Sequence, residues 1–243
     1  GLETMDSLEV SLFASEPMLI NPTNIDIDHR GRVYVCEAYN YRPQFSGVNT
    51  RFEGDRIVIL EDVDGDGNAD SSKVFYQGSE VNAPLGICVL GNEVLVSQSP
   101  YIWRFTDTNF DDRADLREIL FQGIQGIQDD HGAHALALGP DGRYYFTLGN
   151  AGKTISDKNN KPIMTLSGKT IHPDHFRQGM ILRGRLDGTG FEVVGHNFRN
   201  NYESAVDAFG NIWQSDNDDD GNRGTRLNYI LEYGNYGYRD ELT

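Results

Sequence analysis

His131 follows an acidic residue in a segment with the chemistry of a general base. Asp130 and His131 lie in the string QDDHGAH, directly before an apolar stretch that is typical of a β-strand. An imidazole titrates near neutral pH, and an adjacent carboxylate orients it and keeps it basic. Two interpretations are open: His131 is a catalytic base with Asp130 as its orienting partner, or it only forms hydrogen bonds within its loop.

A second polar string, HNFRNN at residues 196–201, precedes a later strand-like stretch in the same way. Arg199 offers a planar, permanently charged fork that suits a carboxylate or a quinone oxygen, and Asn200 beside it can both donate and accept hydrogen bonds. The sequence therefore predicts a ligand-binding pair. The alternative is an ordinary ion pair between Arg199 and one of the many acids of the chain.

Carboxylates at positions 1, 3, 5 and 9 of one loop match the oxygen-ligand pattern of calcium-binding loops. They belong to Asp62, Asp64, Asp66 and Asp70. Gly67 stands at position 6, where such loops turn, but Lys73 replaces the bidentate glutamate of an EF-hand at position 12. We expect either a calcium site of a different, weaker class or a solvated turn between two strands.

Two further acidic segments differ in what they predict. Residues 107–115 repeat the first loop, but Asp112 takes the place of its glycine, which favours a purely structural turn. Residues 216–221 place four carboxylates within five positions, and such a cluster repels itself unless a cation binds. Asp216 and Asp218 are therefore candidate calcium ligands, with a hydrated acidic loop as the alternative.

Two pairs of histidines have the HxxH spacing that can supply two zinc ligands. They are His131 with His134, and His172 with His175. Neither pair lies on a predicted helix, where that spacing would align the two rings, so a shared zinc site is not favoured.

The two cysteines, Cys36 and Cys88, both lie in strand-like apolar runs, and the chain contains no CxxC motif. A cysteine in such a run usually behaves as a small apolar side chain. We therefore expect two buried free thiols rather than a disulfide.

The composition argues against a nucleic-acid partner and against a membrane span. The 243 residues carry 37 acidic and 21 basic side chains, a formal net charge of −16 at pH 7. Such a surface repels the phosphates of DNA and RNA. No apolar stretch approaches the roughly 18 residues that a membrane span needs. We expect a globular protein with no nucleic-acid partner and no membrane span in this chain.

Strand–turn–strand units recur along the chain. Each has an apolar strand, a turn of Asp, Asn or Gly, and a second strand, and the four copies span residues 24–35, 86–96, 135–146 and 204–213. Residues 56–78 also align without a gap on residues 101–123, and residues 181–194 form a shorter copy. An interval of about 45 residues filled by two hairpins is typical of one propeller blade. The sequence predicts an all-β propeller of four-stranded blades.

The chain is expected to form a single β-propeller domain over residues 1–243. A lone blade leaves an apolar face unsatisfied, and radial stacking of blades buries such faces. The four hairpins predict about four blades, which form either a small ring or the front part of a larger one. Residues 151–179 are polar, punctuated by Gly and Pro, and without a clean period, which predicts a long surface loop in the third blade.

Several of these strings resemble the soluble glucose and sorbosone dehydrogenases that depend on pyrroloquinoline quinone (PQQ). The string LALGPDGRYYFTLG after Asp130 and His131 resembles the blade that carries the catalytic histidine in that family. The sequences FRN, WQSD and GNYGY in the last 50 residues resemble its arginine–asparagine pair and the strings that follow. Residues 8–42 and the closing string NYGYRDELT resemble more closely the N-terminal propeller of the large membrane-bound dehydrogenase proteins of planctomycetes and verrucomicrobia. This resemblance implies about four blades of a six-bladed ring, in an N-terminal portion of a longer chain.

The resemblance implies oxidation of a sugar or another alcohol, with hydride transfer to PQQ. His131 would then be the base and Asp130 its orienting partner, while Arg199 and Asn200 would contact the quinone. The resemblance also implies a calcium ion that polarises the quinone, a cytochrome domain in the longer chain as electron acceptor, and export to the periplasm or the cell surface.

Two other functions remain open for such a propeller. The first is a catalytically silent domain that binds a polysaccharide or a protein, in which His131 and Arg199 would be structural loop residues. The second is a metal-dependent hydrolase of the lactonase kind, with an ion held near His131.

Overall fold

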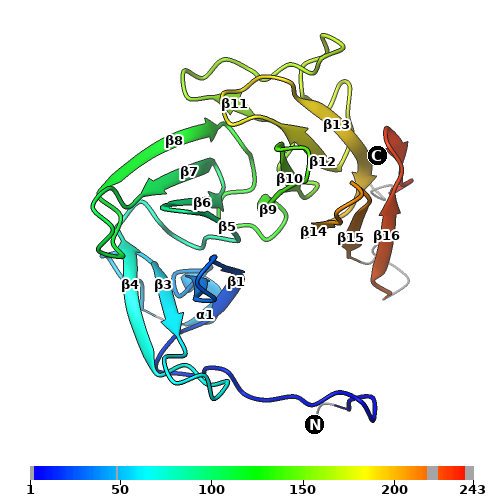
Figure 1. Ribbon diagram of the computed structural model, residues 1–243. Coiled ribbons are helices and arrows are strands. Elements are labelled where there is room, and N and C mark those ends of the chain that lie inside the picture. The colour runs from blue at the N-terminus through cyan, green and yellow to red at the C-terminus, as the bar shows by residue number, and fades with distance from the viewer. Residues whose placement is uncertain (1–2, 48, 218–223, 239–243) are drawn as a thin grey trace.

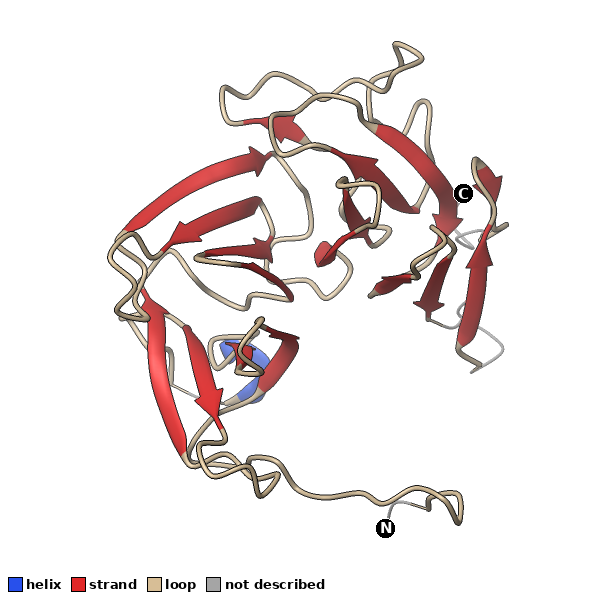
Figure 2. Ribbon diagram, in the orientation of Figure 1, coloured by secondary structure: helices blue, strands red, loops and turns tan. Residues whose placement is uncertain are grey.

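The computed structural model describes residues 3–47, 49–217 and 224–238, which fold almost entirely into β-strands (Figure 2). Four antiparallel sheets surround a common axis as the blades of a β-propeller (Figure 1). The helix α1 (Pro43–Ser46) is one turn long. Within the described ranges, no helix has the length and apolar character needed to cross a membrane. The predicted all-β propeller is confirmed.

In each blade the strands pair in chain order from the axis outward. The first blade contains β1 (Pro22–Ile27), β2 (Val33–Glu37), β3 (Arg56–Glu61) and β4 (Ser71–Gln77). The second contains β5 (Gly86–Leu90), β6 (Glu93–Gln98), β7 (Tyr101–Thr106) and β8 (Leu116–Gln122). The third contains β9 (Ala133–Leu138), β10 (Tyr144–Leu148), β12 (Gly179–Gly184) and β13 (Glu192–Phe198). The fourth contains, in its described part, β14 (Ser204–Val206), β15 (Ile212–Asp216) and β16 (Arg226–Ile230).

Two short strands cover the outer edges of the second and third blades. The strand β11 (Ser156–Asp157) pairs antiparallel with β8, although it belongs to the insertion between β10 and β12. The strand β17 (Gly234–Asn235) follows the fourth blade and pairs in parallel with β13 of the third. The strands β11 and β17 thus form hydrogen bonds with backbone groups of β8 and β13 that would otherwise be unpaired at the edge of the sheet.

The four predicted hairpins are the innermost strand pairs of the four blades, β1–β2, β5–β6, β9–β10 and β14–β15. Their turns need backbone conformations that favour glycine: Gly142 and Gly210 have φ angles of 71° and 84°. Because the inner strands β1, β5, β9 and β14 stand next to one another around the axis, the segments that precede them are brought together.

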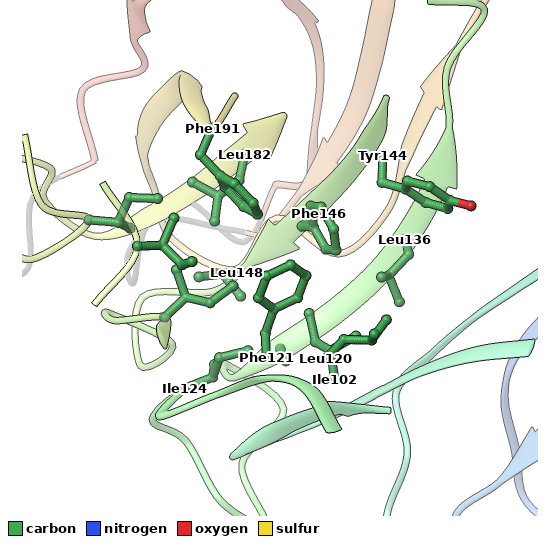
Figure 3. Close-up of a cluster of buried hydrophobic side chains, with 14 of the residues drawn as sticks. Ile102, Leu120, Phe121, Ile124, Leu136, Tyr144, Phe146, Leu148, Leu182 and Phe191 are labelled. Atoms are coloured by element: carbon green, nitrogen blue, oxygen red, sulfur yellow. The ribbon is translucent and has the colours of Figure 1, made fainter. Parts of the chain in front are cut away.

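Apolar side chains fill the spaces between adjacent blades. The largest buried cluster lies between the second and third blades and includes Phe121, Phe146 and Phe191 (Figure 3). The Phe121 ring makes edge-to-face contacts with the other two, at centroid distances of 5.7 and 5.4 Å. A second cluster joins the first and second blades, and a third joins the third and fourth. This packing fixes the inner loops relative to one another.

The insertion at residues 151–179 is not only a surface loop, which corrects the prediction. Ile155, Ile163 and Ile171 are all buried in the cluster between the second and third blades. Backbone bonds join them in sequence: the Ile163 amide donates to the Ile155 carbonyl at 3.0 Å, and the Ile171 amide to the Ile163 carbonyl at 3.1 Å. The insertion is therefore anchored to the core by three isoleucines.

The axis is crossed by polar contacts between blades. The Tyr202 hydroxyl, at the start of the fourth blade, donates to the Leu85 carbonyl at 2.9 Å and lies 3.3 Å from the Thr23 carbonyl. Asn24 of the first blade donates to the Glu203 carboxylate at 3.2 Å. The first and fourth blades are thus connected directly at the centre.

Removing the Tyr202 hydroxyl should weaken this central connection. We expect Tyr202→Phe to lower the free energy of unfolding by about 1–2 kcal/mol, because the Leu85 carbonyl loses its donor in a partly buried place. Urea denaturation measures the change. Tyr233→Phe is the control, since its hydroxyl donates to Glu192 at an exposed position, and its effect should stay within about 0.5 kcal/mol. Equal effects of the two substitutions would contradict the role of Tyr202.

The two cysteines are buried free thiols, as predicted. Burial raises the pKa of the Cys88 thiol to about 12, and it also raises the pKa of Cys36. Both are protonated at neutral pH and belong to the packing of the blades.

Candidate active site

His131 lies in the loop before β9, and its ring is held by a residue from the loop after β10. The His131 Nδ1 atom lies 2.5 Å from the Asn150 side-chain oxygen. The backbone is also fixed, because the His131 carbonyl accepts hydrogen bonds from the amides of Ala151 and Gly152, each at 3.0 Å. Two loops of the third blade therefore set the position and the orientation of this imidazole.

The contact with Asn150 decides which ring nitrogen of His131 can act as a base. An amide oxygen only accepts, so Nδ1 carries the hydrogen in this contact and donates it. The neutral ring then has its lone pair on Nε2. Asn150, rather than Asp130, thus makes the hydrogen bond that orients the ring.

Asp130 and its neighbour Asp129 are paired instead with an arginine from the first blade. The Arg42 Nη2 atom lies 3.3 Å from a carboxylate oxygen of each. Arg42 precedes α1, and its Nε atom also donates to the Gln128 carbonyl at 2.9 Å. Burial alone would raise the pKa of Asp130, but the charges of His131 and Arg42 outweigh burial and lower it. Asp130 is therefore ionised at neutral pH, and the single charge of Arg42 balances one of the two carboxylates beside the histidine.

These groups border an open hollow of about 520 Å³. Its lining contains Arg42, Asp129, Asp130, His131, Asn150, Ala151 and Lys153. It lies between the third blade and the loop that follows β2 of the first. A volume of this size can hold a monosaccharide or another small molecule.

The predicted pair Arg199 and Asn200 lies directly against the His131 loops. The Asn150 amide donates to the Arg199 carbonyl at 2.8 Å, so the residue that bonds His131 also bonds this segment. Gly149 stands between the two: a Cβ atom there would lie 2.6 Å from both the Asn200 side-chain oxygen and the His131 carbonyl. Only a residue without a side chain permits this close approach.

Asp216, one of the predicted calcium ligands, organises the Arg199–Asn200 backbone. One carboxylate oxygen accepts from the Asn200 amide at 2.9 Å, and the other contacts the Arg226 guanidinium. The Asp216 side chain is fully buried, so both oxygens are engaged by protein donors rather than by solvent. Asp218 lies outside the described residues.

The first acidic loop, residues 62–70, connects β3 with β4, far along the first blade from its inner strand (Figure 1). Ligand oxygens of Asp62, Asp64 and Asp70 lie within 4.8 Å of one another. Asp66 lies in the same loop outside this group, and all four carboxylates accept hydrogen bonds from backbone amides of the loop. The loop therefore brings together three of the four predicted carboxylates.

In the second acidic loop, Asp112 forms ion pairs with Arg32 at 2.6 Å and with Lys73 at 3.1 Å. Protein cations balance this carboxylate, in agreement with the structural turn predicted for it. Lys73 stands where an EF-hand has its terminal glutamate, and Asp112 stands where the first loop has a glycine. The ion pair between these two residues connects the first and second blades.

Residues of both HxxH pairs make contacts within the protein. Both ring nitrogens of His134 face carbonyl oxygens, of Asn201 at 2.8 Å and of Asp130 at 2.6 Å. His172 contacts Asp174 at 3.2 Å on the insertion. His134 thereby connects the loop of His131 to the segment that follows Asn200.

Sequence reasoning missed two residues of this site, Arg42 and Asn150. Asn150 follows the strand that the GPDG turn begins, in the string LGNAG, and a polar residue at the end of an inner hairpin was the signal available for it. Arg42 comes from the first blade and lies beside Asp130 only because of how the first and third blades are arranged around the axis. No local sequence pattern signals this contact.

Comparison with solved structures places the fold among propeller dehydrogenases. The PQQ-bound aldose sugar dehydrogenase of Streptomyces coelicolor has a TM-score of 0.62 and 18% identity, with 90% of this chain and 63% of that chain covered. The PQQ domain of pyranose dehydrogenase from Coprinopsis cinerea has a TM-score of 0.55 and 20% identity, with 82% and 44% covered. A gluconolactonase has a TM-score of 0.51 and 15% identity, with 87% and 64% covered.

The chain spans less than two thirds of the length of each of these proteins. At such identities the likeness establishes the propeller fold. No curated protein matches the sequence. The family described as a domain of unknown function, DUF7133, matches residues 1–237. The chain therefore belongs to the DUF7133 family.

Proposed function

We propose that this propeller belongs to a quinone-dependent dehydrogenase that oxidises a sugar or another alcohol, and that it carries the general base. One observation carries the proposal: Asn150 bonds the His131 ring through its side chain and the Arg199 carbonyl through its backbone. The same residue, Asn150, therefore positions both the candidate base His131 and the candidate ligand-binding segment of Arg199. The likeness to solved sugar dehydrogenases that bind PQQ agrees with this assignment.

The donor set of this chain fits one side of a quinone. Asn200 is buried, yet its side-chain oxygen has no hydrogen-bond partner among the described residues. A buried polar atom without a partner is uncommon and suggests a ligand or water at that position. Arg199 would supply a permanent positive charge next to it. We therefore assign Arg199 and Asn200 to contacts with PQQ.

In the proposed reaction, the Nε2 atom of His131 accepts the proton of the substrate hydroxyl. Asn150 keeps Nδ1 protonated, so the lone pair stays on Nε2. Arg42 balances one of the two carboxylate charges beside the ring. PQQ, when bound, would supply the acceptor for the hydride that leaves the carbon bearing this hydroxyl, so the alcohol loses two electrons and the quinone gains them.

We propose a calcium ion, if one binds, at the loop of Asp62, Asp64 and Asp70 rather than at Asp216. The three carboxylates of the first loop can converge on one ion. The oxygens of Asp216 already accept from Asn200 and contact Arg226. Calcium at the first loop would stabilise the β3–β4 connection and would not take part in the chemistry at His131.

We also propose that further blades complete the ring in a longer, exported protein, with a cytochrome domain as electron acceptor. The described blades form an open arc in Figure 1. The fourth blade exposes apolar side chains on one face, among them Trp213, Leu227 and Tyr229. A neighbouring blade would bury that face.

The lactonase alternative needs a cation beside His131. Ligand atoms of Asp129, Asp130 and His131 do lie within 4.8 Å of one another. The Arg42 guanidinium, however, lies 3.3 Å from an oxygen of each carboxylate, and its positive charge would repel a cation bound beside them. This contact favours the dehydrogenase.

Asn150 provides a test of the proposed mechanism. In the full-length protein loaded with PQQ, Asn150→Ala should lower kcat for dye reduction about 100-fold with little change in KM, because the imidazole loses its orientation. Asn150→Asp should restore most of the rate, since a carboxylate also accepts from Nδ1.

The control is Asn159→Ala, an exposed position in the insertion that should leave the rate unchanged. An unaltered kcat in Asn150→Ala, or a loss that the aspartate does not restore, would argue against an orienting role.

A further inference from the structure

Two hollows on the outer part of the third blade share His175 and His196. They have volumes of about 640 and 560 Å³ and lie between the insertion and β13. We call them together the outer hollow. The first is bordered by Arg177 and Asn197, and the second by Lys169 and Phe176. Each volume falls within the range of small-molecule sites.

The two acids that line the outer hollow differ in their partners. Glu192 accepts from Arg143 at 2.7 Å and from Arg183 at 2.9 Å, so its negative charge is balanced by cations next to the hollow. Asp174 is exposed, and its carboxylate lies 3.2 Å from the His172 ring.

The cations of the outer hollow are available to a ligand. Arg177 and Lys169 are exposed and form no ion pair within the described part of the chain. The Lys169 ammonium lies 6.0 Å from the centroid of the Phe176 ring. In a chain with a net charge of −16, this concave surface therefore presents two cations to solvent, with the exposed Asp174 at the edge of the first lobe. Such a surface favours an anionic ligand.

The remaining lining suits a sugar ring. Phe176 provides an apolar face and stands edge-on to His196, at a centroid distance of 6.1 Å. Asn197 and Asn235 place side-chain amides in the first lobe, and the hydroxyls of Thr165 and Ser167 lie in the second. Sugars combine apolar C–H faces with hydroxyls that need both donors and acceptors, and amides supply both.

Two polar atoms of this wall lack hydrogen-bond partners. The His196 Nδ1 atom and the Asn197 side-chain oxygen are buried and unpaired in the described structure. Asn197 also has a φ of 65°, and Gln178, opposite it in the first lobe, has a φ of 61°. Strained residues and unpaired polar atoms concentrate at ligand sites.

We propose that the outer hollow binds an acidic saccharide, whose sugar rings carry carboxylate or sulfate groups. Arg177 and Lys169 would pair with the anionic groups, and Phe176 would pack against a ring face. This site is separate from the hollow of His131, because the two share no lining residue. Binding at the outer hollow does not depend on the quinone chemistry.

Calorimetric titration of the full chain, without added PQQ, tests the proposal. The probes are an oligogalacturonide, which carries carboxylates, a sulfated galactan oligosaccharide, and a neutral galactan oligosaccharide of the same length. We expect saturable binding of at least one acidic probe, weakened by salt, and much weaker binding of the neutral one. Comparison of the two acidic probes identifies which anionic group is recognised. Binding of neither would overturn the proposal.

The double substitution Arg177→Gln and Lys169→Gln should weaken acidic-saccharide binding at least about tenfold, because two charge-assisted contacts are lost. The matched control is Arg113→Gln with Lys161→Gln, two exposed positions outside the outer hollow that remove the same charge. The control should bind as the wild type does. Equal weakening in both double variants would show a general charge effect and overturn the assigned site.

Discussion

His131→Ala should lower kcat for PQQ-dependent dye reduction about 1,000-fold in the full-length protein, which is the usual contribution of a positioned general base. The physical reason is the geometry of the ring: Asn150 holds Nδ1 at 2.5 Å, and only the His131 Nε2 atom is left to accept the substrate proton. Steady-state kinetics with saturating PQQ and a sugar substrate measures the change. The KM for the sugar should move much less than kcat.

Two controls separate this effect from misfolding. His29→Ala removes an exposed histidine of the first blade and should leave kcat unchanged. The unfolding transition of His131→Ala should stay close to that of the wild type, because the ring is only partly buried and the loop is held by backbone bonds. Full activity in His131→Ala would remove the base assignment.

Asp216→Ala should lower the free energy of unfolding by about 3 kcal/mol. The Asp216 side chain is fully buried, and its removal leaves the Arg226 guanidinium and the Asn200 amide without their acceptor. The value lies at the lower end for a broken buried pair because Arg226 is 32% exposed and can recover some hydration. Urea denaturation gives the change directly.

The substitution should also weaken PQQ binding, since the Asn200 backbone loses the contact that positions it. Asp216→Asn retains an acceptor oxygen for that amide, so it should lose less stability and less PQQ affinity than Asp216→Ala. Glu53→Ala, at an exposed position, is the control and should change neither. A change below about 1 kcal/mol in Asp216→Ala would contradict the structural role assigned to this carboxylate.

The fold could be predicted from the sequence because its signals are local. Each inner hairpin combines an alternating or apolar strand with a turn of Asp, Asn or Gly, and these features act over about ten residues. Residues 56–78 also repeat at residues 101–123, and the distance between the two copies, about 45 residues, is the length of one four-stranded blade. Four such units were enough to identify a propeller, and the strands appear where the hairpins were expected.

The insertion shows where local signals fail. Ile155, Ile163 and Ile171 stand eight residues apart with mostly polar residues between them, so no continuous apolar pattern marks a helix or a strand there. Their burial depends on backbone bonds between successive turns of the insertion and on the second blade beneath them. Tertiary contacts, rather than any local period, determine this segment.

The candidate site was predicted in part for the same reason. His131 and Arg199 stood out because each is a polar residue in a string that precedes an inner strand. Arg42 reaches Asp130 across 88 positions of sequence, and nothing near it specifies that contact. The role first given to Asp130 reflected its place next to His131 in sequence, whereas the ring bonds Asn150.

The central claim is that the segment of Arg199 and Asn200 and the loop of His131 form one quinone-binding site. Titration of the full-length protein with PQQ, followed by calorimetry, tests it most directly. We predict saturable binding that weakens at least about tenfold in Arg199→Ala, where a charge-assisted contact is lost, and persists in His131→Ala. Absence of PQQ binding, or an affinity unchanged in Arg199→Ala, would contradict the account.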